Sequence, residues 1–161
     1  MLQVTFSPGG EAGYDRVFSR WAHDIDDMRP LWEALAMDFF NVIETQQFSS
    51  EGRFGSSGWD SLTTGYAKWK RKHYPGRNIL ERKGDLRRSL TQIGAKGNIF
   101  RVSKQQMEVG SSIPYGIYHQ KGTKKMVARK PIELPESARR GWDRQISQFI
   151  MTGKIRIGRM S

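Results

Sequence analysis

The chain has 161 residues and no cysteine, and its 27 Lys and Arg side chains against 16 Asp and Glu give a formal net charge of +11. Without thiols it is neither a disulfide-stapled secreted scaffold nor a zinc ribbon. No apolar run approaches the roughly 18 residues that cross a bilayer, and the first residues lack the pattern of a signal peptide. We therefore expect one soluble basic domain, residues 1–161, from a reducing compartment, with a polyanionic or acidic partner and no membrane.

The first third of the chain is expected to be mainly helical. Residues 2–6 alternate apolar and polar side chains, which predicts a short strand. The next apolar side chains recur at i, i+3, i+4 and i+7, the spacing of an amphipathic helix: Tyr14, Val17, Phe18 and Trp21. A longer helix is predicted over Met28–Phe48 by the same spacing. Residues 49–58, rich in Ser and Gly, predict a flexible loop.

The middle of the chain alternates between short helices and strands. A basic helix is predicted to end at Pro75-Gly76, and a second short helix contains Leu86 and Leu90. After Gly97 the period of the apolar residues changes to two, which predicts antiparallel strands over 98–103 and 106–110.

The last third begins with a short helical turn after Pro114 and a basic loop over 121–129. An amphipathic helix over 138–150 follows, and 151–161 is predicted to be a C-terminal tail. This order indicates an α+β fold in which N-terminal helices pack on a small antiparallel sheet, with a C-terminal amphipathic helix. The side chains expected in the core are Trp32, Leu35, Phe39, Ile43, Leu86, Leu90, Val109 and Trp142.

The charge is unevenly distributed. The first sixty residues carry four basic and ten acidic side chains, a net of −6, whereas the remaining 101 carry 23 basic and six acidic, a net of +17. Residues 68–88 form the densest basic stretch. Three readings stay open: a solvated face, a DNA-binding surface, and an acidic half that docks on the basic half of the next copy.

Catalytic and metal-binding patterns are weak. His23, His73 and His119 are far apart in the sequence and have no Asp or Glu at ligand spacing, so we expect no metal and no cofactor. Asp60 with Glu81 and Lys83 imitates a metal-dependent nuclease, but a pattern this short in a Lys-rich chain is better explained by chance.

Aromatic residues are interleaved with the basic ones in 68–88, as in proteins that stack nucleic-acid bases. Trp69, however, follows Tyr66 by three residues on the same helix face. We therefore expect Trp69 to be a core residue rather than a stacking platform.

Five motifs in the second part occur in a fixed order. They are Trp59-Asp60-Ser61-Leu62, Ile79 to Leu90 with Gly84 and Arg87 inside it, Val109-Gly110-Ser111, Pro114 to Thr123 with His119-Gln120 inside it, and Met126 to Pro131 with Ala128-Arg129 inside it. In this order they resemble the phage virion morphogenesis family, the tail-completion proteins that include the Mu-like phage G protein. The resemblance covers about residues 28–150.

The resemblance implies a structural virion protein rather than an enzyme, made in the bacterial host cytoplasm and located at the head–tail junction. It also implies a closed homo-oligomeric ring, commonly six-fold, that contacts neck or connector and tail-tube proteins and DNA in its lumen. The alternative function is a basic DNA-binding or packaging accessory protein. Candidate interface or lumen residues are Lys68, Arg71, Arg87, Arg88, Tyr115, Tyr118, His119, Lys121, Lys124, Lys125 and Arg129.

A ring joins one face of a subunit to a different face of the next. The charge asymmetry suits such a contact. The hypothesis is that Asp24, Asp26, Asp27 and Glu33 approach Lys68, Arg71, Arg87 and Arg88 of a neighbouring copy. The competing hypothesis is that the two parts pair within one subunit.

Overall fold

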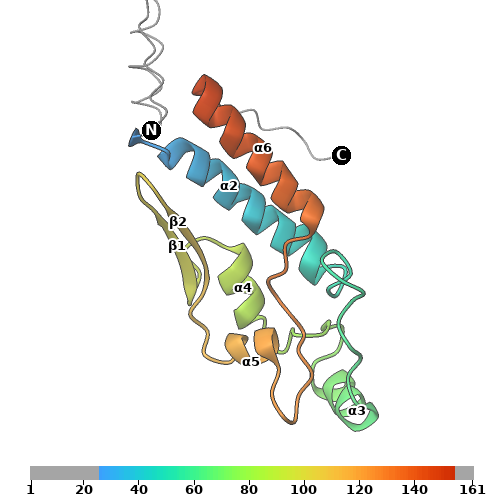
Figure 1. Ribbon diagram of the computed structural model, residues 1–161. Helices are drawn as coiled ribbons and strands as arrows, with labels where there is room; N and C mark the ends of the chain where they lie inside the picture. Colours follow the sequence, from blue (N-terminus) through green and yellow to red (C-terminus); the bar gives the residue numbers. More distant parts are fainter. Residues whose placement is uncertain (1–25, 155–161) are drawn as a thin grey trace, which may run out of the picture.

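The computed structural model describes residues 26–154, which form an α+β fold built around one central helix (Figure 1). This helix, α2, spans Arg29–Val42 and continues as a π-helical segment, η1, over Ile43–Phe48. The helix predicted over Met28–Phe48 is thus confirmed, with its last turns wound as a π-helix. Pro30 lies in the first turn, where a missing N–H costs no helical hydrogen bond.

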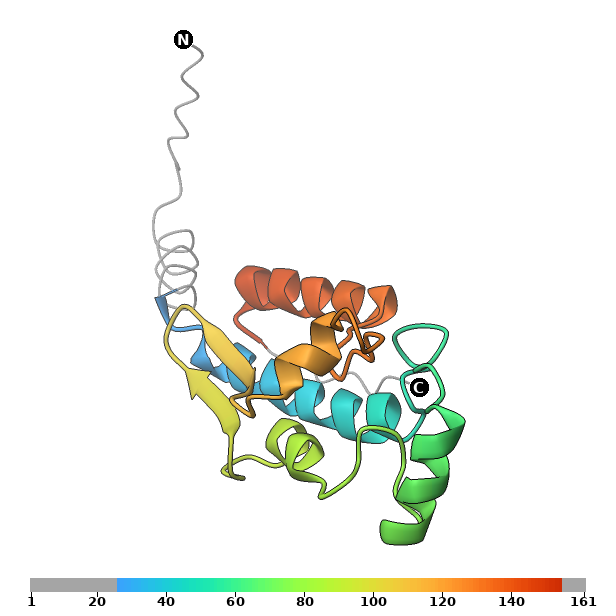
Figure 2. The ribbon, with the colours of Figure 1, turned by 90° about the horizontal axis from the view of Figure 1, so that it is seen from below.

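Two layers cover opposite sides of α2. On one side lie α4, Asp85–Thr91, and an antiparallel hairpin of β1, Asn98–Val102, and β2, Met107–Ser111. On the other side α6, Glu136–Thr152, runs alongside α2, as Figures 1 and 2 both show. The two strands predicted over 98–103 and 106–110 therefore form, each shifted by one residue at most.

The core has two parts because α2 is buried on two sides. One cluster joins Phe39, Phe40 and Phe48 to Leu86 and Leu90 of α4. The second joins Leu31 and Leu35 to Phe149 of α6, and the indole N–H of Trp142 ties the helices together by donating to Asp38 Oδ2 at 2.5 Å.

Four of the eight side chains predicted to lie in the core are confirmed as buried. Leu35, Phe39, Leu86 and Leu90 are buried, whereas Trp32, Val109 and Trp142 are half-buried at the edges of the clusters; the side chain of Ile43 is not among those described. The strand predicted over 2–6 and the helix around Tyr14–Trp21 also lie outside the described residues.

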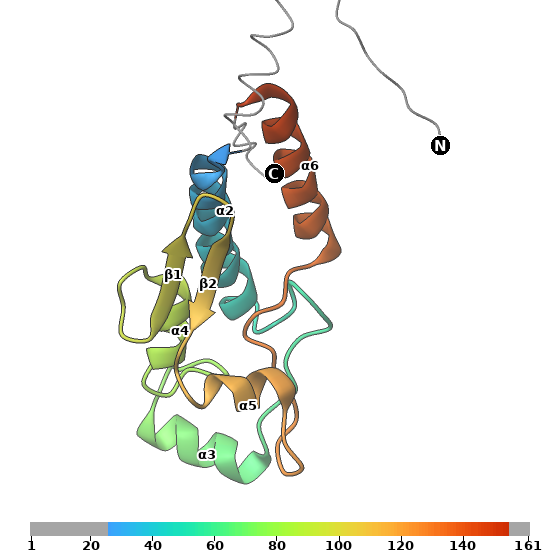
Figure 3. The same ribbon diagram turned by 60° about the vertical axis from the view of Figure 1, so that its left-hand side comes forward.

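The remaining elements gather at one end of α2, away from its first residue. They are α3, Thr64–His73, and α5, Gly116–Lys121, which both lie below α2 in Figure 3. The segment 49–58 leads from η1 toward them through hydrogen-bonded turns. α6 ends at Thr152, two residues into the predicted tail. Within residues 26–154 no helix is both long and apolar enough to cross a membrane.

Candidate assembly site: a cationic cleft with an apolar rim

A cleft of about 690 Å³ opens at the end of the molecule that carries α3 and α5. Its walls come from α3, the loop before α4, α5 and a tight turn closed by the Thr123–Met126 bridge. The lining residues are Ser61, Leu62, Thr63, Tyr66, Lys70, Ile79, Leu80, Glu81, Arg82, Lys83, Asp85, Tyr115, His119, Lys125, Met126, Val127 and Arg129. Segments from four of the five sequence motifs therefore meet in one cleft.

The charge of the lining is strongly positive. Five lining residues are Lys or Arg and only two are acidic. Both carboxylates have arginine partners that do not line the cleft, because Glu81 accepts from Arg87 at 2.9 Å and Asp85 from Arg88 at 2.5 Å. The exposed cations Arg82, Lys83 and Lys125 therefore remain available to an anionic partner, whereas Lys70 is buried.

One residue that lines the cleft has an unusual backbone conformation. Leu80 has a φ of 64°, in the left-handed region, which costs a bulky residue about 1–3 kcal/mol. Its neighbours fix it: Ile79 N donates to Glu51 Oε1 at 2.9 Å, and buried Lys70 donates through Nζ to the carbonyl of Asn78. Strain of this kind persists where the surroundings impose it, and it is concentrated at functional sites.

Burial also affects the ionisable groups of the cleft. It lowers the pKa of Lys70, against the opposing attraction of Glu81 and Glu51. Burial, with a smaller contribution from the charge of Arg129, lowers the pKa of His119, which favours its neutral form. The Nδ1 atom of His119 is buried and has no hydrogen-bond partner, and its ring meets that of Tyr115 edge-on at 6.0 Å.

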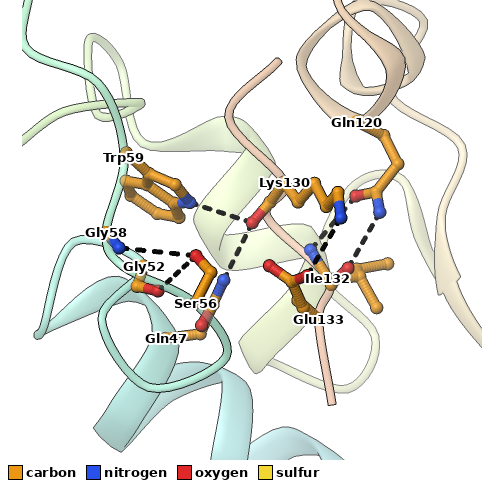
Figure 4. Close-up of polar contacts among 9 residues, drawn as sticks. All are labelled: Gln47, Gly52, Ser56, Gly58, Trp59, Gln120, Lys130, Ile132 and Glu133. Atoms are coloured by element: carbon orange, nitrogen blue, oxygen red, sulfur yellow. Dashed lines mark hydrogen bonds and ion pairs between the residues drawn. The ribbon is translucent and has the colours of Figure 1, made fainter. Parts of the chain in front are cut away.

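A strap of chain over 129–133 is tied by hydrogen bonds to η1, Trp59 and α5 (Figure 4). The carbonyl of Lys130 accepts two hydrogen bonds of 2.9 Å, one from Trp59 Nε1 and one from Gln47 Nε2. The Gln120 amide brackets Ile132, donating to its carbonyl at 2.8 Å and accepting from its N–H at 3.2 Å.

Arg129 completes this connection. Its guanidinium donates to the carbonyls of Asp60 at 2.7 Å and Ser61 at 2.9 Å, and its own N–H donates to the carbonyl of His119 at 2.8 Å. Residues from three distant motifs are thus joined by hydrogen bonds to main-chain carbonyls. Their role here is to position the walls of the cleft.

Apolar side chains lie exposed around the opening. Tyr66, Tyr115 and Val127 line the cleft and are 42%, 43% and 57% exposed, and Ile117 and Tyr118 follow on α5. Apolar side chains of this size, gathered at a cleft and rimmed by charges, are typical of an interaction surface.

The prediction that Trp69 belongs to the core is wrong. Trp69 is 40% exposed and stacks between Tyr66, at 5.5 Å, and His73, at 4.7 Å. The cause is the placement of α3 at the periphery of the molecule (Figure 3), where Tyr66 and Trp69 are not packed into the core.

The predicted interface residues fall into three groups. Tyr115, His119, Lys125 and Arg129 line the cleft; Arg87 and Arg88 are in ion pairs with its carboxylates; and the others are exposed outside its lining, namely Lys68, Arg71, Tyr118, Lys121 and Lys124. Sequence reasoning missed Lys70, whose burial has no sequence signal, and also Arg82, although it lies within a motif.

The nuclease-like set does not form one site. Glu81 and Lys83 line the cleft but Asp60 does not, and Glu81 is paired with Arg87. Among residues 26–154, no group of three or more His, Asp and Glu side chains is placed to hold a metal ion.

Comparison with known proteins gives one match. No curated protein and no solved structure matched the chain. The model of the phage virion morphogenesis family matches residues 12–146, which confirms the resemblance drawn from the five motifs. The residues that form the strap and the cleft all lie within this range. The chain belongs to the phage virion morphogenesis family.

Proposed function

We propose that this protein is a tail-completion or neck protein that forms a closed ring at the head–tail junction and lets DNA pass through it. Membership of the family supports a role in building the virion. In this proposal the protein is structural and not an enzyme, and its partners are its own copies, the connector above and the tail tube below. The ring number of six is part of the proposal.

The observation that carries the proposal is where the ion pairs lie. One pair, Arg29 with Asp27, lies in the acidic first part, and all the others found within 26–154 lie in the basic second part. The charges of the two parts are therefore not neutralised by ion pairs between them inside the described subunit. A head-to-tail contact between copies would bring them together.

Ion pairs within the subunit reduce the number of charged residues that are available for such a contact. Asp27 is held by Arg29, and Arg87 and Arg88 are held by acids of their own subunit. Asp26 and Glu33, near the start of α2, are exposed, and so are Lys68 and Arg71 on α3. The two sets lie on elements at opposite ends of the molecule (Figures 1 and 3) and so form two different surfaces, as a head-to-tail contact requires.

Apolar contacts must supply most of the affinity. Exposed ion pairs contribute only about 0–1 kcal/mol each, so they set register and encounter rate rather than strength. The exposed rim of Tyr115, Ile117, Tyr118 and Val127 provides the apolar surface for this purpose.

The test reverses charges at the acidic end. The double variant Asp26→Lys with Glu33→Lys should block ring closure, measured by native mass spectrometry and electron microscopy, while leaving the melting temperature of the monomer nearly unchanged. Glu136→Lys with Asp143→Lys, the same charge change on the exposed face of α6, is the matched control and should still form rings. A full-length protein that stays monomeric with its tail-tube partner present would refute the ring. A destabilised monomer would favour pairing within the subunit.

One observation favours the alternative, a DNA-binding or packaging accessory protein. The exposed stack of Tyr66, Trp69 and His73 lies on a helix that also exposes Lys68 and Arg71. A DNA-binding protein would bind duplex as a monomer, with an affinity that falls steeply with salt, by a slope of about 0.9 per neutralised phosphate. Lys68→Glu with Arg71→Glu should then reduce that slope, and Arg139→Glu with Arg144→Glu on α6 should not.

A further inference from the structure

The cleft combines an apolar lining with surplus positive charge, and no part of 26–154 fills it. We propose that it receives residues 14–21 of the neighbouring copy, so that each subunit of the ring inserts its N-terminal segment into the next. This inference rests on the proposed ring and names the segment that closes it.

The sequence of the segment matches such a cleft. Four apolar side chains recur with the spacing of one helix face: Tyr14, Val17, Phe18 and Trp21. At 3.6 residues per turn, Glu11 flanks this stripe on one side and Asp24 on the other, whereas Asp15 and Arg20 lie about 110° from its centre on opposite sides and Arg16 faces away from it. The predicted face is therefore apolar with acidic edges.

The cleft offers the complementary arrangement. Its apolar residues include Leu62, Ile79, Leu80 and Val127, and its cations include Arg82 and Lys83. Its volume of about 690 Å³ lies within the usual range for binding pockets, about 300–1,000 Å³, which leaves room for large anchoring side chains. An amphipathic helix laid in an apolar groove is a common mode of peptide recognition.

The distances favour insertion between copies rather than within one. Residue 26 lies at the end of α2 away from α3 and α5 (Figures 1 and 3). The helix from Arg29 to Phe48 is roughly 30 Å long at about 1.5 Å per residue. The five residue steps from Asp26 back to Trp21 span at most about 18 Å, even fully extended. This connection is shorter than the α2–η1 helix, which favours the cleft of a neighbouring copy as the recipient of Trp21.

The apolar lining of the cleft favours residues 14–21 over DNA as its occupant. A phosphate backbone needs cations but gains little from a lining of Leu62, Ile79 and Leu80. The exposed Lys68 and Arg71 of α3, which do not line the cleft, are better suited to DNA.

The test uses the absence of cysteine from the chain. Two full-length variants, Phe18→Cys and Val127→Cys, are given tags of different mass, co-expressed and treated with a short bismaleimide. We expect a covalent heterodimer linked through positions 18 and 127. The control replaces Val127→Cys by Ile93→Cys, which is similarly exposed, at 50% against 57%, but lies outside the cleft; it should give at least tenfold less cross-link.

A full-length chain that carries both Phe18→Cys and Val127→Cys distinguishes insertion between copies from insertion within one chain. A ladder of covalent oligomers supports insertion between copies, and a link confined to single chains overturns it. Rings seen by electron microscopy without this cross-link overturn the inference and leave the proposed function standing. A chain that forms no ring under any condition fails the proposed function and the inference with it.

A second readout needs no cysteine. Phe18→Ala with Trp21→Ala should raise the concentration at which rings dissociate by at least tenfold, with the circular dichroism and melting temperature of the monomer unchanged. Rings as stable as those of the unmodified chain would contradict the inference.

Discussion

The indole nitrogen of Trp59 donates a 2.9 Å hydrogen bond to the carbonyl of Lys130, a residue 71 positions further along the chain. The same carbonyl accepts from Gln47 Nε2, also at 2.9 Å. Three segments are therefore joined at one oxygen atom: the end of η1, the first family motif and the strap over 129–133 (Figure 4).

This shared acceptor predicts that the two donors are coupled. Trp59→Phe and Gln47→Met should each cost about 0.5–1.5 kcal/mol, because one donor still satisfies the carbonyl. The double variant should cost more than the sum, because the Lys130 carbonyl then loses both of these partners. Urea denaturation of all four proteins measures the difference, and strictly additive costs would contradict the shared role.

Gly52 is predicted to tolerate no side chain. Its φ is 86°, and a Cβ there would lie 2.4 Å from the Trp59 ring. Gly52→Ala should therefore cost about 2–4 kcal/mol from strain and overpacking. Gly141→Ala is the matched control, since a Cβ in this helical position meets nothing within 4 Å and should stabilise α6 by about 0.5–1 kcal/mol. Thermal melting of both variants should move in opposite directions.

Truncation to alanine at two nearby positions of α2 is predicted to have sharply different effects on the free energy of unfolding. Leu35 is 1% exposed and packs in the cluster with Phe149, whereas Met37 is 52% exposed on the same helix. Leu35→Ala should cost about 2–5 kcal/mol of unfolding free energy, and Met37→Ala should stay within about 0.5 kcal/mol. Similar costs for both would reject the assigned faces of α2.

His119 is predicted to make stability depend on pH. Because its pKa is lowered in the folded protein, the unfolded chain takes up a proton first as the pH falls below the ordinary histidine value, near 6.5. This contribution to stability is complete above that value, decreases below it, and levels off below the folded pKa. His119→Gln should reduce the drop in melting temperature between about pH 7.5 and 5.5. An unchanged drop would show that another group causes it.

The sequence predicted the local elements well, since each carries its own signal. The apolar spacing around Leu35 and Phe39 placed α2, and the change of period after Gly97 placed β1 and β2. The family motifs were also readable as a pattern. The structural role of these motifs could not be predicted from the sequence. The hydrogen bonds of Trp59 with Lys130 and of Arg129 with Asp60 join residues about 70 positions apart.

The site itself was decided by the tertiary structure. Trp69 has the sequence spacing of a core residue, yet it is exposed because α3 is placed at the edge of the molecule. Lys70, next to it, has the sequence of a surface residue, yet it is 5% exposed because its ammonium group reaches the carbonyl of Asn78. Helix periodicity states only which side chains share a face. Whether that face meets the core, the cleft or solvent depends on where the helix is packed, which the long-range contacts alone determine.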